Sequence, residues 1–319
     1  MNSLVALNRG LRIGVVLAAS LLAGCGLHPA AHAGSSSVAL APAVAKGPEL
    51  RQPSLLHGAL PRNRLSAHTA RALELAELDR YWVTAQESVH RQVVDLLAQH
   101  QSELRRGILH AKLQRGDRSR KWIALTFDDG PHPGYTQRIL KILRQYDVPA
   151  TFFLVGEMAE RHPDLVRAEA ADGHSIANHT YHHLSLTKIP QDSVATEIKA
   201  CGEVLRSITG KAPRLFRPPG GEYNDQVAEA SEALGYRMIL WTDDPGDYAS
   251  PGADVILKRT LERVDNGGII LLHDGIEQTV EVLPQILRYL KSHGYECVTI
   301  DEMLERKAIA AARLHPREG

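Results

Sequence analysis

From Lys121 onward, short apolar runs alternate with amphipathic segments. Short apolar runs bounded by turn residues are typical of buried strands, and apolar residues three or four positions apart are typical of helices. The runs predict strands near 122–127, 151–155, 174–178, 214–217, 237–241, 268–273 and 296–300. The amphipathic stretches predict helices at 136–146, 191–208, 225–234, 254–265 and 279–292. This alternation predicts an α/β fold with a mainly parallel sheet, either closed into a barrel or open and doubly wound.

A longer helical pattern precedes the strands. From Ser66 to about Arg115, apolar residues recur at three- and four-residue steps among Glu, Arg and Gln. The pattern predicts one long helix or a helical hairpin that packs on the following domain. A dimerising coiled coil is disfavoured because the heptad is not strictly kept.

The first residues have the pattern of an export signal. Arg9 and Arg12 precede an apolar stretch that is short for a membrane span. LLAGC at 21–25 resembles the bacterial lipobox, which predicts cleavage after residue 24 and a lipid anchor on Cys25. Ordinary cleavage near AHAG at 31–34 is the alternative and would leave a soluble protein. Either way we expect the mature chain in the bacterial cell envelope, facing the periplasm or exterior, and Gly26 is compatible with the outer membrane.

These patterns divide the chain into five parts. They are a signal peptide at 1–24, a flexible tether at 25–63, a helical extension at 64–118, an α/β domain at 119–308 and a tail at 309–319. Lys+Arg and Asp+Glu are equal at 37 each, and no long basic block occurs, so nucleic acid is not an expected partner. Cys201 and Cys297 could form a disulfide in an oxidising compartment or remain two buried thiols.

Segments rich in polar and ionisable residues follow five of the predicted strands. They are FDDGP after 122–127, NHTYHH (178–183), RPPGGEYN (217–224), WTDDPGDY (241–248) and LLHD (271–274). Because the carboxyl ends of parallel strands meet at one face, we expect these segments to form a single site.

Two histidines and a pair of aspartates indicate a metal site. His179 and His183 lie four residues apart, so both imidazoles can share a metal with a carboxylate, while His182 offers a competing spacing. If Asp129 completes the ligand set, one coordination position stays open for water, and Asp128 is free to act as a general base. The alternative for the DDGP fragment alone is a turn in which aspartates cap backbone groups. Two imidazoles and a carboxylate suit Zn²⁺, although the same ligands accept other divalent ions.

Five segments, in order along the chain, resemble the motifs of the polysaccharide deacetylases, also called carbohydrate esterase family 4 or the NodB homology domain. They are TFDDG (126–130), HTYHH (179–183), RPPGG (217–221), DPGDY (244–248) and LLH (271–273). The resemblance spans roughly residues 121–300 and implies a distorted (β/α)7 barrel. It also implies metal-dependent removal of acetyl groups from N-acetylated polysaccharides.

The resemblance implies a role for each matching residue. Asp128 is similar to the catalytic base and His273 to the general acid, and the metal ligands would be Asp129, His179 and His183. The base carboxylate would be held by Arg217, while Asp247 would orient His273 and raise its pKa. The pocket for the acetyl methyl would be lined by Leu271.

Two positions depart from the motifs. Gly220 stands where the third motif usually has an aromatic residue, so one wall of the groove is lost, while the backbone N–H that would stabilise the oxyanion is kept. Tyr248 stands where the fourth motif often has Trp, and it offers a sugar a smaller flat face. Sugar preference is therefore expected to differ from that of relatives with the aromatic residues.

The expected substrate contains N-acetylglucosamine, as in peptidoglycan, poly-N-acetylglucosamine or a chitin-like polymer. Two other functions stay open: a catalytically weak, metal-containing lipoprotein that binds glycans at the envelope, and a deacylase for a different acyl group. A binding module has no need for both a base and an acid, so the presence of Asp128 and His273 favours the enzyme.

Overall fold

The computed structural model describes residues 90–306. Its strands are β1 (Lys112–Leu113), β2 (Trp122–Asp128), β3 (Thr151–Leu154), β4 (Ser175–Asn178), β5 (Leu215–Phe216), β6 (Arg237–Ile239), β7 (Gly268–His273) and β8 (Glu296–Cys297). Its α-helices are α2 (Val93–Arg105), α3 (Thr136–Tyr146), α4 (Gly156–Arg161), α5 (Pro163–Ala171), α6 (Gln191–Thr209), α7 (Asp225–Ala233), α8 (Ala253–Arg263) and α9 (Glu277–Ser292). The predicted signal peptide, Cys25, the tether, the start of the helical extension and the tail lie outside these residues.

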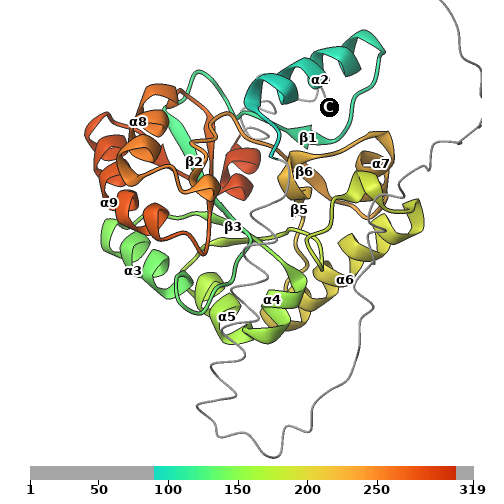
Figure 1. Ribbon diagram of the computed structural model, residues 1–319, viewed down its shortest axis with the longest axis horizontal. Coiled ribbons are helices and arrows are strands. Elements are labelled where there is room, and N and C mark those ends of the chain that lie inside the picture. The colour runs from blue at the N-terminus through green and yellow to red at the C-terminus, as the bar shows by residue number, and fades with distance from the viewer. Residues whose placement is uncertain (1–89, 307–319) are drawn as a thin grey trace, which may run out of the picture. The chain divides into compact units, whose positions relative to one another are not determined.

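The strands form a parallel, curled sheet that is surrounded by helices (Figure 1). The strand order is β1-β6-β5-β4-β3-β2-β7, and β8 pairs with β2. A parallel bridge between Asp243 and Ile270 joins the segment after β6 to β7, so the ends of this order approach each other. The predicted distorted (β/α)7 barrel is therefore confirmed, with β1 as an additional strand next to β6.

Each predicted strand and helix of the α/β domain has a counterpart in the structure. The strand expected at 296–300 is shorter, because β8 ends at Cys297 and Ile300 already belongs to a helix. Two helices between β3 and β4, α4 and α5, were not predicted. Both are short, and Pro163 begins the second helix directly after the first has ended, so neither shows a sustained period.

The prediction that the helical extension continues to about residue 115 is wrong at its end. The helix α2 stops at Arg105, and Gly107 adopts a left-handed conformation with φ of 73°. Lys112 and Leu113 then pair with Met238 and Ile239 of β6 as a strand. A two-residue strand is too short to show the alternation that would separate it from a helix. The last part of the extension is thus a component of the sheet.

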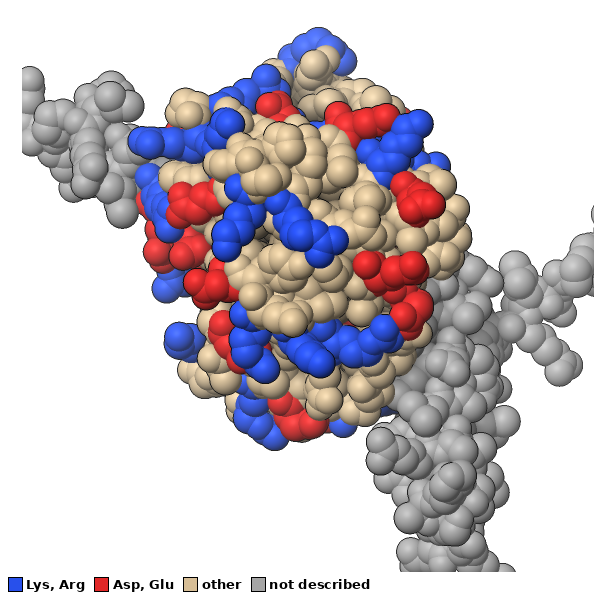
Figure 2. Space-filling model, turned by 90° about the vertical axis from the view of Figure 1, so that its left-hand side faces the viewer, with Lys and Arg blue, Asp and Glu red and all other residues tan. Residues whose placement is uncertain are grey.

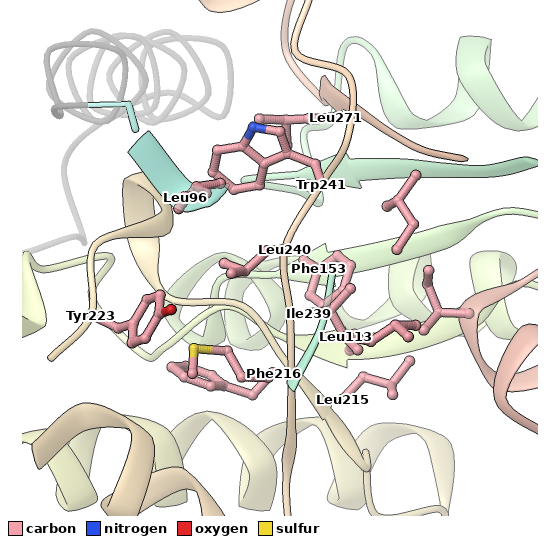
Figure 3. Packing of buried hydrophobic residues seen from close by; sticks show 14 of the residues in the cluster. Leu96, Leu113, Phe153, Leu215, Phe216, Tyr223, Ile239, Leu240, Trp241 and Leu271 are labelled. Carbon is pink, nitrogen blue, oxygen red and sulfur yellow. The ribbon is translucent and has the colours of Figure 1, made fainter. Parts of the chain in front are cut away.

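Alternation along the strands sends neighbouring side chains to opposite faces of the sheet. Along β2, Ile123, Leu125 and Phe127 belong to a cluster that also contains apolar residues of α3 and α9. Ala124 belongs instead to a second cluster, which includes Leu271, Trp241 and Leu96 (Figure 3). The same alternation places Asp128 on the face of Ala124, and His273 on the face of Leu271. The base and acid candidates therefore share the inner face of the sheet.

The two cysteines of the domain are free thiols. Cys201 is buried on α6 and donates to the carbonyl oxygen of Leu154 at 3.4 Å, while Cys297 is half-buried on β8. Burial raises the pKa of each thiol to about 12. Of the two possibilities left open by the sequence, the structure has two unpaired thiols, which are poor nucleophiles at neutral pH.

Acidic and basic side chains are interspersed on the face of the protein shown in Figure 2. Among residues 90–306, none of the helices combines the length and the apolar character needed to cross a membrane.

Candidate active site

The three predicted metal ligands come together at the carboxyl ends of β2 and β4. Asp129 directly follows β2, His179 directly follows β4, and His183 lies one turn further along the same loop. Asp129 Oδ1 lies 3.1 Å from His183 Nε2 and 3.4 Å from His179 Nε2. One ligand atom from each of the three buried residues lies within 4.8 Å of the other two. This spacing fits a single cation between them.

His182, the competing candidate, points elsewhere. Its side chain is 53% exposed, and its Nδ1 lies 2.7 Å from Glu197 Oε1 on α6. The four-residue spacing of His179 and His183, and not the three-residue spacing to His182, therefore brings two imidazoles to Asp129.

The polar atoms of this cluster are suited to a metal ion. Asp129 Oδ1 and His183 Nε2 are buried, and although they lie 3.1 Å apart, neither has a well-aligned hydrogen-bond partner among residues 90–306. Buried polar atoms are nearly always satisfied in folded proteins, so this pair indicates a missing ligand. The Nδ1 of His179 lies 2.8 Å from the carbonyl oxygen of Arg217, which fixes the ring with Nε2 toward Asp129. Two imidazoles and one carboxylate are the donors expected for Zn²⁺.

The backbone of the ligand loops is held in an unusual conformation. Asp129 and His183 have φ values of 74° and 57°, in the left-handed region that side chains other than glycine rarely adopt. Between the histidines, Thr180 also has a positive φ, and its hydroxyl accepts a hydrogen bond from the N–H of His183. Strain of this kind persists where the surrounding structure enforces it, most often at functional sites.

Asp128 is held by a buried arginine, as the resemblance implied. Arg217 Nη1 donates to Asp128 Oδ1 at 2.6 Å and to Thr126 Oγ1 at 2.9 Å. Its Nε donates to the carbonyl oxygen of Ile239, and the guanidinium lies 4.0 Å from the centre of the Phe153 ring. Burial lowers the pKa of Arg217, and the facing Asp128 carboxylate opposes this effect. One oxygen of Asp128 is thus fixed, while Oδ2 lies 3.7 Å from His179 Nε2, on the metal side.

His273 and Asp247 form the second predicted pair. His273 Nδ1 lies 2.7 Å from Asp247 Oδ1, and the His273 N–H donates to Oδ2. The same carboxylate accepts hydrogen bonds from the Thr279 hydroxyl at 2.6 Å and the Tyr248 N–H at 3.0 Å. Burial lowers the pKa of His273, but the facing Asp247 and the carboxylates of the metal side outweigh it and raise the pKa to about 10. Asp247 therefore favours the protonated form of the His273 imidazole.

Of the three predicted substrate-binding residues, Tyr248 and Leu271 adjoin this pair, and Gly220 lies in the turn that contacts Arg91. The Tyr248 and His273 ring centres are 5.5 Å apart. Gly220 has a φ of 62°, and its carbonyl oxygen accepts a hydrogen bond from the Arg91 N–H. Leu271 is fully buried two residues before His273 on β7. The roles predicted for the three residues stay predictions.

Several residues of the site were not singled out from the sequence. Thr126 accepts from Arg217, and Thr279 donates to Asp247. Single threonines at such positions carry no signal, because their partners lie 91 and 32 residues away. His90 was also missed, although its ring lies 5.1 Å from that of His273. It falls in the helical extension, where the sequence predicted packing alone.

Comparisons with known proteins agree with this geometry. A family model described as polysaccharide deacetylase matches residues 115–239. A peptidoglycan-N-acetylglucosamine deacetylase of Bacillus cereus is 42% identical over 192 residues, which cover 59% of this chain and 90% of the relative. A chitooligosaccharide deacetylase of a Bradyrhizobium species is 36% identical, covering 54% of this chain and 86% of the relative. The crystal structure of a peptidoglycan N-acetylglucosamine deacetylase superposes with a TM-score of 0.59 at 35% identity, covering 61% of this chain and 92% of the other.

Proposed function

Because the chain belongs to the polysaccharide deacetylase family, we propose that it is a metal-dependent enzyme that removes N-acetyl groups from N-acetylglucosamine units of an envelope polysaccharide. The observation that carries the proposal is the placement of Asp128 between two groups. Its Oδ2 lies 3.7 Å from His179 Nε2 of the candidate metal cluster, and His273 pairs with Asp128 in register on the neighbouring strand β7. A base, an acid and a candidate metal site in one buried location are the parts that amide hydrolysis requires.

The ion would be held by Asp129 Oδ1 and by the Nε2 atoms of His179 and His183. A divalent ion supplies Lewis acidity at the amide carbonyl and a lowered pKa for water. Zn²⁺ is the ion that we expect in this site, because of its preference for imidazole and carboxylate ligands.

Proton transfer is divided between two residues. Asp128 takes a proton from the attacking water through Oδ2, since Oδ1 is occupied by Arg217. His273 carries a proton because Asp247 raises its pKa, and it donates this proton to the amide nitrogen as the C–N bond breaks. Acetate and a free amine are the products.

Substrate binding is assigned to the residues around the acid. The N–H of Gly220 stabilises the oxyanion of the tetrahedral intermediate, and Leu271 lies against the acetyl methyl. Tyr248 offers a sugar the face of its ring that His90 does not cover, beside His273. These roles are supported by position, since all three residues adjoin the His273–Asp247 pair or the third motif.

The favoured substrate is peptidoglycan, because the relative that matches over 192 residues carries that activity in its name. Deacetylation turns a neutral sugar into one that is cationic near neutral pH, which changes how an envelope polymer is recognised. A lipid anchor on Cys25, ahead of a flexible tether, would place the enzyme at this substrate.

The direct test is acetate release by the purified, Zn²⁺-loaded chain from peptidoglycan, β-1,6-linked poly-N-acetylglucosamine and chitooligosaccharides. We expect release from at least one polymer and its loss after treatment with a chelator. Binding of a polymer without acetate release, in a folded sample that retains metal, would instead favour a glycan-binding lipoprotein. Release from an O-acetylated or N-formylated substrate alone would favour a deacylase for another acyl group.

A further inference from the structure

A histidine from outside the five motifs lies inside the candidate active site. His90 precedes α2, and its ring stacks on Tyr248 with the ring centres 3.8 Å apart and the planes inclined by 14°. The same ring meets His273 edge-on, with the centres 5.1 Å apart. His90 therefore lies against both the aromatic residue and the general acid that we assign to substrate binding and catalysis.

The backbone next to His90 is fixed to another part of the site. The N–H of Arg91 donates to the carbonyl oxygen of Gly220 at 2.8 Å. Gly220 has no side chain, so the extension can approach the 3₁₀ turn Pro219–Gly221 at backbone distance. Residues 90–92 thus connect the Gly220 turn with Tyr248, and we call them the entry segment.

The entry segment is attached to a firmly packed helix. Leu96 on α2 is fully buried in the same cluster as Trp241 and Leu271 (Figure 3). On the opposite end of α2, Glu103 is buried and pairs with Lys112 Nζ and with the Tyr223 hydroxyl. These contacts attach the extension to the loop that follows Gly220. We therefore expect the extension to be a fixed wall and not a mobile lid.

Both ring nitrogens of His90 are buried and lack a hydrogen-bond partner within the described part of the chain, residues 90–306. Burial, followed by the charge of His273, lowers the pKa of His90 to about 3, so the imidazole is neutral and offers one donor and one acceptor. His90 is not among the three residues whose ligand atoms cluster within 4.8 Å. The unpaired nitrogens therefore call for a polar ligand other than the metal.

We propose that the entry segment forms one wall of the substrate groove, and that His90 is a specificity-determining residue that hydrogen-bonds the N-acetylhexosamine unit being deacetylated. The inference rests on the proposed function, because it takes the sugar at His273 as its ligand. A sugar hydroxyl or acetamido group supplies the donor and acceptor that His90 lacks. Stacking on Tyr248 fixes the imidazole plane, so little side-chain freedom is lost when the sugar binds.

The test compares two variants of His90 with a control on α2, the helix that follows it. His90→Phe keeps a flat ring against Tyr248 and removes both nitrogens, while His90→Asn restores hydrogen-bonding groups without the ring. His100→Phe is the matched control, because His100 is 41% exposed on α2. Steady-state acetate release from chitooligosaccharides gives kcat and KM separately, and hydrolysis of 4-nitrophenyl acetate reports the reaction without a sugar.

We expect His90→Phe to lower kcat/KM for the oligosaccharide about five- to tenfold, mainly through KM, which is the effect of losing one or two hydrogen bonds. The loss for 4-nitrophenyl acetate should be smaller than the loss for the oligosaccharide, His90→Asn should recover part of the loss, and His100→Phe should stay within about twofold of the unaltered chain. Unchanged oligosaccharide kinetics in His90→Phe would overturn the inference. Higher activity of this variant would overturn it too, because His90 would then be obstructing the groove.

A failure of the proposed function can be distinguished from a failure of the inference about His90. If the unaltered chain releases no acetate from any polymer, the enzyme proposal fails, and binding of the same oligosaccharides is measured by calorimetry. Weaker oligosaccharide binding by His90→Phe than by His100→Phe would still support the inference that the entry segment lines the substrate groove. Equal binding by the two variants would overturn it.

Discussion

The two sides of the active site differ in how their buried polar atoms are satisfied. On the metal side, formed by Asp129, His179 and His183, a carboxylate oxygen and an imidazole nitrogen are buried without a hydrogen-bond partner among the described residues. On the acid side, formed by His273, Asp247 and Thr279, the carboxylate of Asp247 accepts hydrogen bonds from both other members and from the backbone. The acid side is complete within the protein, whereas the metal side needs a cation to complete it.

Because of this difference, the two sides have different roles in the proposed reaction. In the proposed mechanism the metal side would hold a cation, and the backbone of its ligand loops is strained at Asp129 and His183. In the proposed mechanism the acid side would contribute a proton, and its Asp247 carboxylate raises the pKa of the His273 imidazole. Variants of the metal side should therefore change the affinity for metal, and variants of the acid side should change the pH dependence of activity.

The largest effect is expected at Asp128, where the two sides meet. Asp128→Asn keeps an oxygen for Arg217 but removes the base, so the rate of acetate release should fall by about 10²- to 10⁴-fold. Metal content, measured by atomic emission, should be unchanged, because Asp128 is not one of the three clustered ligands. A variant that keeps more than about a tenth of the rate would contradict the assignment of Asp128 as the base.

A ligand of the metal side should affect binding of the ion first. His183→Ala removes one of three ligands, and we expect its affinity for Zn²⁺ to fall by at least about 100-fold, with loss of the thermal stabilisation that Zn²⁺ gives. His182→Ala is the matched control, since this neighbour hydrogen-bonds Glu197 away from the cluster. Equal affinities of the two variants in a calorimetric titration would show that the cluster is not the metal site.

On the acid side, the expected effect is a change in pH dependence. Asp247→Asn removes the carboxylate that raises the pKa of His273, so the pKa of the imidazole should fall. His273 acts while protonated, so activity is lost as pH rises through its pKa, and the alkaline limb of kcat/KM should move to lower pH. A bound divalent ion lowers the pKa of His273 in both proteins, so the comparison is made at equal metal loading. An unmoved alkaline limb would mean that another group is the acid.

A smaller change of the same kind is expected from Thr279→Val. It removes one hydrogen bond to Asp247 Oδ2 and keeps the volume of the side chain. The loss of about 1 kcal/mol corresponds to about a fivefold decrease in kcat, together with a small shift of the alkaline limb in the opposite sense to that of Asp247→Asn. The shift is opposite because an Asp247 oxygen with one partner fewer attracts the imidazolium proton more strongly. Unchanged kcat would show that the hydroxyl does not position Asp247.

The metal ligands could be predicted from the sequence, because Asp129 and the two histidines follow strands with clear apolar runs, whereas His273 and Asp247 were expected only through the resemblance to the family motifs. Asp129 and His179 directly follow β2 and β4, and parallel strands bring such positions to one face. The entry segment could not be predicted in this way. The contact of Arg91 with Gly220 joins residues far apart in the sequence, and it depends on the packing of α2 through Leu96. Hydrophobic periodicity predicted that a helix packs here but not what its preceding residues touch.

The measurement that tests the account most directly is acetate release by chelator-stripped protein during stepwise addition of Zn²⁺. We expect no activity without metal and a linear rise that ends when one ion is bound per chain, because Asp129, His179 and His183 form a single candidate site among residues 90–306. Full activity in the stripped protein, or no activity at full occupancy of the site, would contradict metal-dependent deacetylation.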